Sequence, residues 1–452
     1  MTVKNKFSSE KLQLFLYFLF ISLIGSVLLV LPVAYKEGIS VSYIDALFTA
    51  VSAVSVTGLS TLSMEIYSRT GLVFILILIE TGGLGILTYI SLLMTVSSKK
   101  ISVANRNLVK DFFIDDIDYR PRFILRKIIS ITIIIQFIGF LFLMPGLYKS
   151  GDREFIFHSL FLSISAFCNA GFSPFSDSLG QFSENWYVLS VIMVLIILGG
   201  IGFVVFTNIG QKLKAKREGR KFYLSLHVKI VLIATAVLLL LGFVFTFLSF
   251  LTINTWNFST GKTIITALFE SVSLRTAGFE TISQQSFPPA STIFHLVLMF
   301  IGGSPGSIAG GVKTTTFFIT MLYLLDGNEQ RNTVSFLNRR IPSSVINKSV
   351  TIISRSILII ILSAILLAVT EQHLILEGTF SIIDLVFEST SAFATVGLSR
   401  GLTPELSVFG KIVIILTMYI GRTGIFAMSI KSGIFETDKN DYIYPEESVL
   451  IG

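Results

Sequence analysis

Charged side chains are scarce in this sequence. Asp, Glu, Lys and Arg make up 14% of its 452 residues, against about 25% in soluble domains. Apolar residues account for 52%, which is too much for a wetted surface to cover. The composition argues against a soluble protein. It favours a bundle of helices in a bilayer, where an exposed backbone would find no hydrogen-bond partners.

Cysteine and histidine are also rare. The single cysteine, Cys168, excludes an intramolecular disulfide, and the four histidines lack the spacing of zinc ligands. We find no Ser–His pair in neighbouring apolar runs, no cluster of metal ligands and no nucleotide motif. We therefore expect a protein that is not an enzyme and that holds no cofactor of its own.

Eight apolar runs are long enough to cross a hydrocarbon core of about 30 Å, which takes about 20 residues. They cover residues 12–31, 72–96, 128–147, 186–208, 228–251, 293–325, 350–369 and 408–430. Lys and Arg gather at both chain ends and after every second run, so the positive-inside rule places both termini in the cytoplasm. The net charge of +7 is explained by this topology and does not indicate nucleic-acid binding.

A shorter segment between the two runs of each pair repeats four times. Residues 46–59 read ALFTAVSAVSVTGL, 159–172 read SLFLSISAFCNAGF, 267–279 read ALFESVSLRTAGF and 385–398 read LVFESTSAFATVGL. Each has an aromatic residue, a serine four positions later and a glycine near its end. All are too short to cross the membrane, and all fall on its outer side. This pattern favours re-entrant half-helices over ordinary loops with a helix-capping glycine.

Half-helices followed by extended turns are suited to a selectivity filter for a cation. Each half-helix would direct the negative end of its dipole toward the pore, and each turn would offer carbonyl oxygens in place of water. Glycine suits such a turn because it reaches φ > 0 without strain. The expected K⁺ filter consists of Val56, Thr57, Gly58, Asn169, Ala170, Gly171, Thr276, Ala277, Gly278, Thr395, Val396 and Gly397.

The sixth apolar run contains one proline and five glycines, which an undisturbed helix would not tolerate. We predict a broken helix with an irregular loop at 302–312, below the filter, that occludes the ion path and moves aside. The expected gate residues are Gly302, Gly303, Ser304, Pro305, Gly306, Gly310, Gly311, Lys313 and Arg422. A phosphate-binding loop is disfavoured because Val312 interrupts its pattern.

Several charges fall inside or beside the apolar runs. A charge in a span is costly and indicates function, so Arg422 would donate to loop carbonyls or form a positive barrier in the pore. For Arg422 and Lys313 the alternative is that they reach the inner interface. Glu80, Glu270 and Glu388 lie near the filter, where support of its backbone is favoured over direct ion contact. The basic stretch Lys212–Lys221 suits anionic lipid headgroups or an acidic partner.

The chain resembles the Trk/Ktr/HKT superfamily of potassium transporters over residues 12–430. The resemblance rests on Val56-Thr57-Gly58, Asn169-Ala170-Gly171, Thr276-Ala277-Gly278 and Thr395-Val396-Gly397. Eight spans, rather than ten, are most similar to the KtrB-type membrane subunit. The implied fold is an all-α membrane protein with four span–half-helix–span repeats around one pore. The repeats occupy residues 12–96, 128–209, 228–325 and 350–430, between cytoplasmic tails at 1–11 and 431–452.

The same resemblance implies a potassium uptake subunit of the cell membrane. It implies a homodimer, regulated by a cytoplasmic ring of KtrA-type subunits that bind nucleotide, with Na⁺ as a candidate activator. In this superfamily serine at the first filter glycine is associated with Na⁺ transport, so Gly58 favours K⁺. A Na⁺-conducting or Na⁺/K⁺-transporting member is the alternative. A scaffold with a degenerate pore is disfavoured because all four glycines are present.

Overall fold

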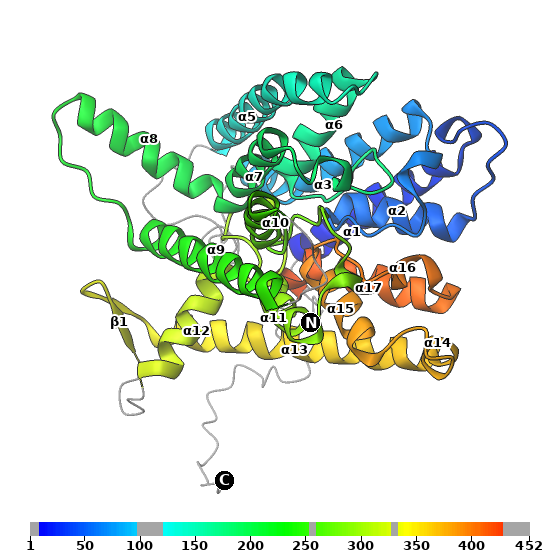
Figure 1. Cartoon of the computed structure of the whole chain (residues 1–452). Helices are drawn as coiled ribbons and strands as arrows, with labels where there is room; N and C mark the ends of the chain where they lie inside the picture. Colours follow the sequence, from blue (N-terminus) through cyan, green and yellow to red (C-terminus); the bar gives the residue numbers. More distant parts are fainter. Residues whose placement is uncertain (1–8, 97–120, 253–258, 327–332, 428–452) are drawn as a thin grey trace, which may run out of the picture.

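The computed structural model describes residues 9–96, 121–252, 259–326 and 333–427 (Figure 1). Within these ranges the chain is helical, as predicted. Of the two predicted tails, residues 1–8 of the first and all of the second (431–452) lie outside the described residues. The basic loop at 97–120 also lies outside them.

Four similar units follow one another along the chain, each with a first long helix, a half-helix and a second helix. The first helices are α1 (Ser9–Val30), α5 (Pro121–Lys149), α9 (Leu226–Thr252) and α13 (Ser343–Thr370). The half-helices are α2 (Tyr43–Ser55), α6 (Phe155–Cys168), α10 (Thr260–Ser273) and α15 (Ile382–Ala394). The second helices are α3 (Arg69–Val96), α7 (Trp186–Ile201) with α8 (Phe203–Arg217), α11 (Pro289–Phe300) with α12 (Thr314–Asp326), and α17 (Val408–Ala427).

Short helical turns complete the outer connections. They are η1 (Pro32–Ala34), η2 (Met64–Ile66), η3 (Gly180–Phe182), η4 (Gln284–Ser286), α14 (Gln372–Leu376) and α16 (Leu402–Glu405). One of them, η2, η3, η4 or α16, follows the half-helix of each unit. The four units therefore share their connections as well as their helices.

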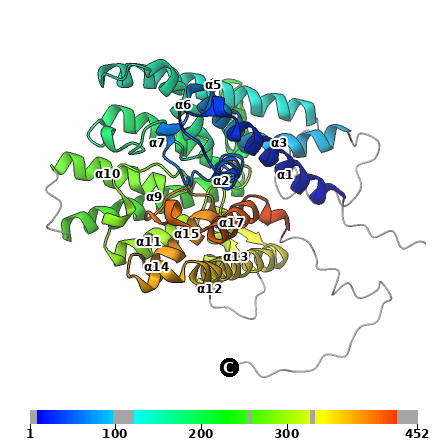
Figure 2. The same ribbon diagram turned by 90° about the vertical axis from the view of Figure 1, so that its right-hand side faces the viewer.

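The units are arranged in a closed circle. In Figure 2 the first unit lies at the right, the second at the top, the third at the left and the fourth at the bottom. Helix α3 packs on α5 and α6, α7 on α10, α11 on α15, and α17 on α2, so each unit contacts the next and the fourth contacts the first. This arrangement brings the ends of the four half-helices toward a common centre.

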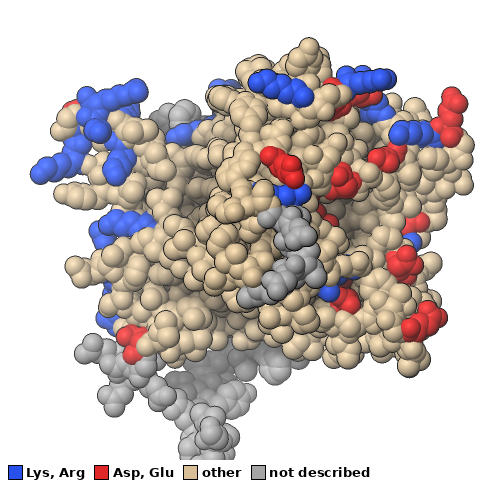
Figure 3. Space-filling model, viewed as in Figure 1, with Lys and Arg blue, Asp and Glu red and all other residues tan. Residues whose placement is uncertain are grey.

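The outside of the molecule is apolar around its middle. Figure 3 shows basic side chains gathered at the left, over α8, a broad band almost free of charge, and acidic side chains toward the right. Among the described residues three helices are long and apolar enough to cross a membrane, within α5, α9 and α13, or four if α7 and α8 form one bent span. The structure is that of a helical multi-pass membrane protein. The eight-span count stays a prediction.

One predicted helix is wrong. The sequence predicted an unbroken span at 186–208, but α7 ends at Ile201 and α8 leaves it at an angle of 94°. The break is at Gly202, whose φ of 94° and ψ of 144° are not helical. Glycine reaches this conformation at little steric cost. A side chain there would also collide with the chain at Pro305, because a Cβ on Gly202 would lie 2.7 Å from the Pro305 carbonyl oxygen.

A second departure from the all-α prediction is a small hairpin between α12 and α13. Strands β1 (Val334–Phe336) and β2 (Arg339–Ile341) pair antiparallel, with Val334 opposite Ile341. Leu337 and Asn338 between them both have positive φ, 49° and 59°, as a two-residue type I′ turn requires. The sequence does not indicate this turn, because leucine rarely takes such a conformation.

Helix α3 lies against the end of α2 at a glycine. A Cβ on Gly82 would overlap the carbonyl group of Val54, whereas a Cβ on Gly210 in α8 would meet nothing within 4 Å. We expect Gly82→Ala to push α3 away from α2 and to cost about 1–3 kcal/mol of stability. Gly210→Ala is the control and should be neutral, or stabilising by up to about 1 kcal/mol.

Thermal unfolding of the detergent-solubilised protein checks this prediction. The midpoint of Gly82→Ala should fall below that of the wild type, and the midpoint of Gly210→Ala should not. Equal midpoints for the two variants would contradict the close contact between α2 and α3.

Candidate functional site

Each half-helix is followed by a turn with two left-handed residues. In the first, second and fourth units Val56, Asn169 and Thr395 have φ of 58°, 56° and 50°, and in the third Thr276 has 65°. The glycines two positions later, Gly58, Gly171, Gly278 and Gly397, have φ of 98°, 70°, 75° and 95°. Positive φ is a real outlier for β-branched residues such as valine and threonine. Strain of this kind, about 1–3 kcal/mol per residue, is concentrated at functional sites.

The four turns meet in a ring. A Cβ on Gly58 would lie 2.5 Å from the Ala170 carbonyl oxygen, and one on Gly171 would lie 3.0 Å from that of Ala277. A Cβ on Gly278 would overlap the Val396 carbonyl oxygen, and one on Gly397 would overlap that of Thr57. Each glycine thus faces the carbonyl that precedes the next glycine, and the fourth turn returns to the first. A side chain at any of these positions would press against a neighbouring carbonyl group, so the ring would have to shift to accept it.

A serine in each half-helix holds the turn that follows it. The carbonyl oxygens of Ser52, Ser165, Ser273 and Ser391 accept hydrogen bonds from Thr57, Ala170, Ala277 and Val396, at 2.8, 2.8, 3.0 and 2.9 Å. Each serine hydroxyl forms a hydrogen bond with the glycine of its turn or with the residue that follows this glycine. Those of Ser52 and Ser391 accept from Gly58 and Gly397, both at 3.1 Å, and those of Ser165 and Ser273 donate to the carbonyls of Phe172 and Phe279.

The side chains of the turns are packed into the protein. Val56, Thr57, Asn169, Ala170, Thr276, Ala277, Thr395 and Val396 are all buried. The glycines have no side chain, so the surface that the turns present to one another is backbone. Carbonyl oxygens in such a ring suit a dehydrated monovalent cation. Among the described residues no group of three or more His, Cys, Asp or Glu is placed to hold a metal ion.

The three glutamates near the turns have partners in the protein. Glu270 accepts a hydrogen bond from Gln284 at 3.1 Å, and Glu388 accepts from Ser399 at 2.9 Å. Glu80 accepts from Gln136 in α5 at 2.9 Å. These contacts connect the half-helices or second helices to surrounding segments.

The loop between α11 and α12 folds back on itself beneath the ring. Gly302 N–H donates to Val312 C=O at 2.9 Å, and Thr314 N–H donates to Gly303 C=O at 3.1 Å. A Cβ on Gly310 would collide with the hydroxyl of Thr395, so the loop touches the turn of the fourth unit. All of its residues from Ile301 to Val312 are buried or nearly so.

The same loop is bonded to the break between α7 and α8. Ser304 N–H donates to Gly200 C=O at 2.9 Å, and Phe203 N–H donates to Gly306 C=O at 3.0 Å. The two helix breaks therefore satisfy each other's backbone groups, which lipid could not do. The Gly199-Gly200-Ile201-Gly202 run could have indicated this break. The prediction instead treated residues 186–208 as one span.

Three cationic side chains donate to carbonyls of the loop. Arg422, from α17, binds Ile308 C=O at 2.5 Å and Gly82 C=O at 2.8 Å, and it is only 6% exposed. Lys313 binds Ala309 C=O at 2.6 Å. Arg275, which sequence reasoning did not select, contacts Gly302 C=O at 3.4 Å. Arg422 is thus enclosed by protein and does not extend to the inner interface.

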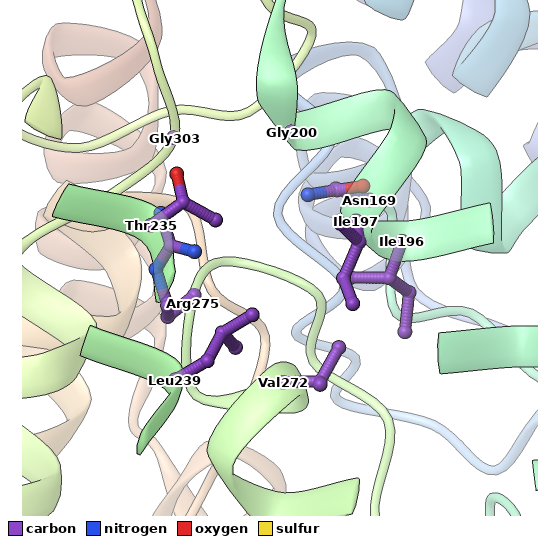
Figure 4. Close-up of a pocket in the computed structure, with 9 residues that line it drawn as sticks. All are labelled: Asn169, Ile196, Ile197, Gly200, Thr235, Leu239, Val272, Arg275 and Gly303. Atoms are coloured by element: carbon purple, nitrogen blue, oxygen red, sulfur yellow. The ribbon is translucent and has the colours of Figure 1, made fainter. Parts of the chain in front are cut away.

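A small cavity lies between the second and third units, beside the ring and the loop. Figure 4 shows Asn169, Thr235, Arg275 and Gly303 around it, with the apolar side chains of α7, α9 and α10. Its volume of about 10 Å³ admits roughly one water molecule. The Thr235 hydroxyl and the Arg275 Nε have no hydrogen-bond partner in the described part of the chain. Packing at this boundary is therefore incomplete.

Comparison with known proteins connects this site to a family. Residues 5–442 match the family model TrkH, described as cation transport protein. The chain is 36% identical to the potassium/sodium uptake protein NtpJ of Enterococcus hirae, over 96% of this chain and 95% of that protein. It is 36% identical to the Ktr system potassium uptake protein B of Vibrio alginolyticus (97% and 94% covered) and 33% identical to the Ktr system potassium uptake protein D of Bacillus subtilis (97% and 96%).

A solved structure gives the same fold. The crystal structure of the potassium transporter TrkH from Vibrio parahaemolyticus matches with a TM-score of 0.74 at 19% identity, covering 95% of this chain and 86% of that chain. The circle of four half-helices, the full-length relatives and the family match agree with one another. This chain belongs to the TrkH family of cation transport proteins, and its full-length relatives include Ktr system potassium uptake proteins.

Proposed function

We propose that this chain is the ion-translocating subunit of a potassium uptake system, with the ring of four glycine turns as its selectivity filter. The observation that carries the proposal is the closed contact order of Gly58, Gly171, Gly278 and Gly397, each against the carbonyl of the next unit. A ring of backbone carbonyls replaces the hydration shell of a monovalent cation. The half-helices add the negative ends of four dipoles at the same place.

The loop at 302–312 is proposed as the gate. It lies against the fourth filter turn, and the donors of Arg422, Lys313 and Arg275 occupy the carbonyls of Ile308, Ala309 and Gly302. Carbonyls engaged in this way are not free to coordinate an ion, and fixed positive charge repels one. Opening then requires the loop to leave these donors and move aside.

The wider arrangement is also a proposal. Both chain ends are assigned to the cytoplasm, on the side where Lys212, Lys214, Lys216 and Arg217 of α8 project (Figure 3). Two such chains would form a homodimer in the cell membrane, controlled by a cytoplasmic KtrA-type ring that binds the nucleotide. Anionic lipid headgroups are the proposed partners of the basic α8 at the inner surface. Na⁺ is the proposed activator.

A second candidate function is transport of Na⁺, alone or with K⁺. The name of the Enterococcus relative includes both ions. The side chains behind the turns also differ between units, with Val56, Asn169, Thr276 and Thr395 at matching positions. The four turns are held by unlike neighbours, so the ring is not strictly four-fold. Relative uptake of K⁺ and Na⁺ by cells that lack their own potassium uptake distinguishes the two functions.

The first test of the filter is Gly58→Ser. A side chain here would meet the Ala170 carbonyl and would also have to accept a φ of 98°, so the ring must widen or distort. We expect K⁺ uptake and its preference over Na⁺ to fall, by about tenfold if the change costs near 1.4 kcal/mol. The matched control is Gly38→Ser, at φ of 82° with nothing within 4 Å. Uptake by Gly58→Ser equal to that of Gly38→Ser would refute the filter assignment.

The test of the gate is Arg422→Gln. The substitution removes a charge and at least one of the donors that hold Ile308 and Gly82, so the loop should be released more easily. We expect cation flux in proteoliposomes to rise in the absence of any partner protein, by several-fold if about 1 kcal/mol of restraint is lost. Exposed Lys36 provides the control Lys36→Gln, which should leave flux unchanged. A fall in flux, in correctly folded Arg422→Gln, would argue against restraint of the loop.

A further inference from the structure

Two of the four half-helices have an aspartate in their first turn, at the same position of the repeat. Asp45 in α2 and Asp384 in α15 both follow an N-terminal serine by three residues, Ser42 and Ser381. Each aspartate binds its serine, Asp45 through the hydroxyl at 2.5 Å and Asp384 through the hydroxyl at 2.7 Å and the N–H at 2.8 Å. This is the usual exchange of a helix N-terminus, where a carboxylate also complements the dipole.

Both aspartates use their second oxygen to hold the chain that leaves the filter. The Asp45 Oδ1 accepts from the Thr61 hydroxyl at 2.8 Å, and the Asp384 Oδ1 accepts from the Arg400 Nε at 2.5 Å. Thr61 and Arg400 occupy matching places, three residues after Gly58 and Gly397. Each aspartate therefore ties the outer end of its own filter turn to the start of its own half-helix.

Each of these contacts is also bonded to a neighbouring unit. Lys411 of the fourth unit donates to Asp45 of the first at 2.7 Å. Arg400 of the fourth unit donates to Gln284 C=O at 2.6 Å and to the Thr292 hydroxyl at 3.0 Å, both in the third. The side chains of these two ion pairs are only 11–14% exposed. Ion pairs this well enclosed are screened far less than surface pairs.

The remaining two units lack this arrangement. His158 occupies the matching position in α6 and bonds to Asp152, ahead of the half-helix, at 2.7 Å. Thr266 occupies it in α10, and its hydroxyl has no partner in the described structure. At the boundary of the second and third units the outer ion pair joins Lys262 to Glu184, which is 76% exposed. Exposed pairs of this kind contribute little.

We propose that Asp45 with Lys411, and Asp384 with Arg400, are positioning residues that fix the outer ends of the first and fourth filter turns. Burial acts to raise the pKa of the Asp45 carboxyl, but hydrogen bonds from Lys411, Ser42 and Thr61 lower it overall. The carboxylate therefore stays ionised, as the ion pair needs. The inference rests on the proposed function, because only a filter makes the spacing of these turns matter for ion choice.

The consequence is a filter whose first and fourth turns are held at their outer ends by enclosed ion pairs, whereas the third is held there by hydrogen bonds between Glu280 and residues 178–179 of the second unit. Distinguishing K⁺ from Na⁺ depends on how closely the carbonyls can follow the smaller ion. Release of the first turn would let it approach Na⁺ and would reduce discrimination without closing the pore. A residue needed only for folding would lower total transport and leave the ratio of the two ions unchanged.

The experiment is a double-mutant cycle on Asp45→Asn and Lys411→Met. Fluxes of K⁺ and Na⁺ are measured in proteoliposomes for both single variants, the double variant and the wild type. Each single variant should lower the K⁺/Na⁺ flux ratio about fivefold or more, and the double variant should fall no further, because the two residues act as one unit. Glu184→Gln, which breaks the exposed outer pair, is the control and should keep the wild-type ratio.

An unchanged ratio in both single variants, or additive effects in the double variant, would overturn the inference. A second measurement separates it from the proposed function. If K⁺ binds the ring, KCl should raise the unfolding temperature of the wild type more than NaCl does, and Asp45→Asn should reduce this difference. If the wild type shows this difference but carries no K⁺ flux, the proposed conduction is refuted and the positioning role is not. An undiminished difference in Asp45→Asn would refute the positioning role.

Discussion

The structure depends on four stretches of non-helical backbone that meet inside a protein embedded in a bilayer. Lipid offers these stretches no hydrogen-bond partner, and they lie so close together that a side chain at Gly58, Gly171, Gly278 or Gly397 would press against a neighbouring carbonyl group. Both requirements are met by the half-helices, whose serines accept the turn N–H groups and whose lengths bring the turns to one centre. The recurring serine and glycine of each repeat are thus two parts of one constraint.

This constraint explains why the four turns could be predicted from the sequence. Four glycines, four serines and four apolar half-helices recur in register, and each has a single physical reason to be where it is. The same reasoning failed where a contact joins distant segments that do not repeat. Arg275 near Gly302, and Lys411 beside Asp45, carry no local pattern, because the partners lie far apart along the chain. Gly202 was visible in the sequence, but an apolar run conceals a break that only a tertiary contact makes favourable.

The two helix breaks explain each other. A bend at Gly202 would leave unpaired backbone groups, and so would the loop after α11; together they exchange hydrogen bonds through Gly200, Ser304, Phe203 and Gly306. Movement of the loop therefore cannot be independent of α8, whose basic end projects from the other side of the bend (Figure 1). A force applied to the basic end of α8 has a direct covalent and hydrogen-bonded route to the loop at 302–312.

The four units, although alike in fold, are joined unequally. The fourth unit is fastened to the first by the enclosed ion pair between Lys411 and Asp45, and to the third by hydrogen bonds from Arg400 to Gln284 and Thr292. The boundary of the second and third units has an exposed ion pair, hydrogen bonds between Glu280 and residues 178–179, and a cavity with unpartnered polar atoms. That boundary is also where the loop, Arg275 and the bend of α7 and α8 meet. Low local packing and unsatisfied groups are features of segments that move. Under the proposed function, motion of the loop would be accommodated at the second and third units, while the enclosed ion pairs hold the first and fourth turns.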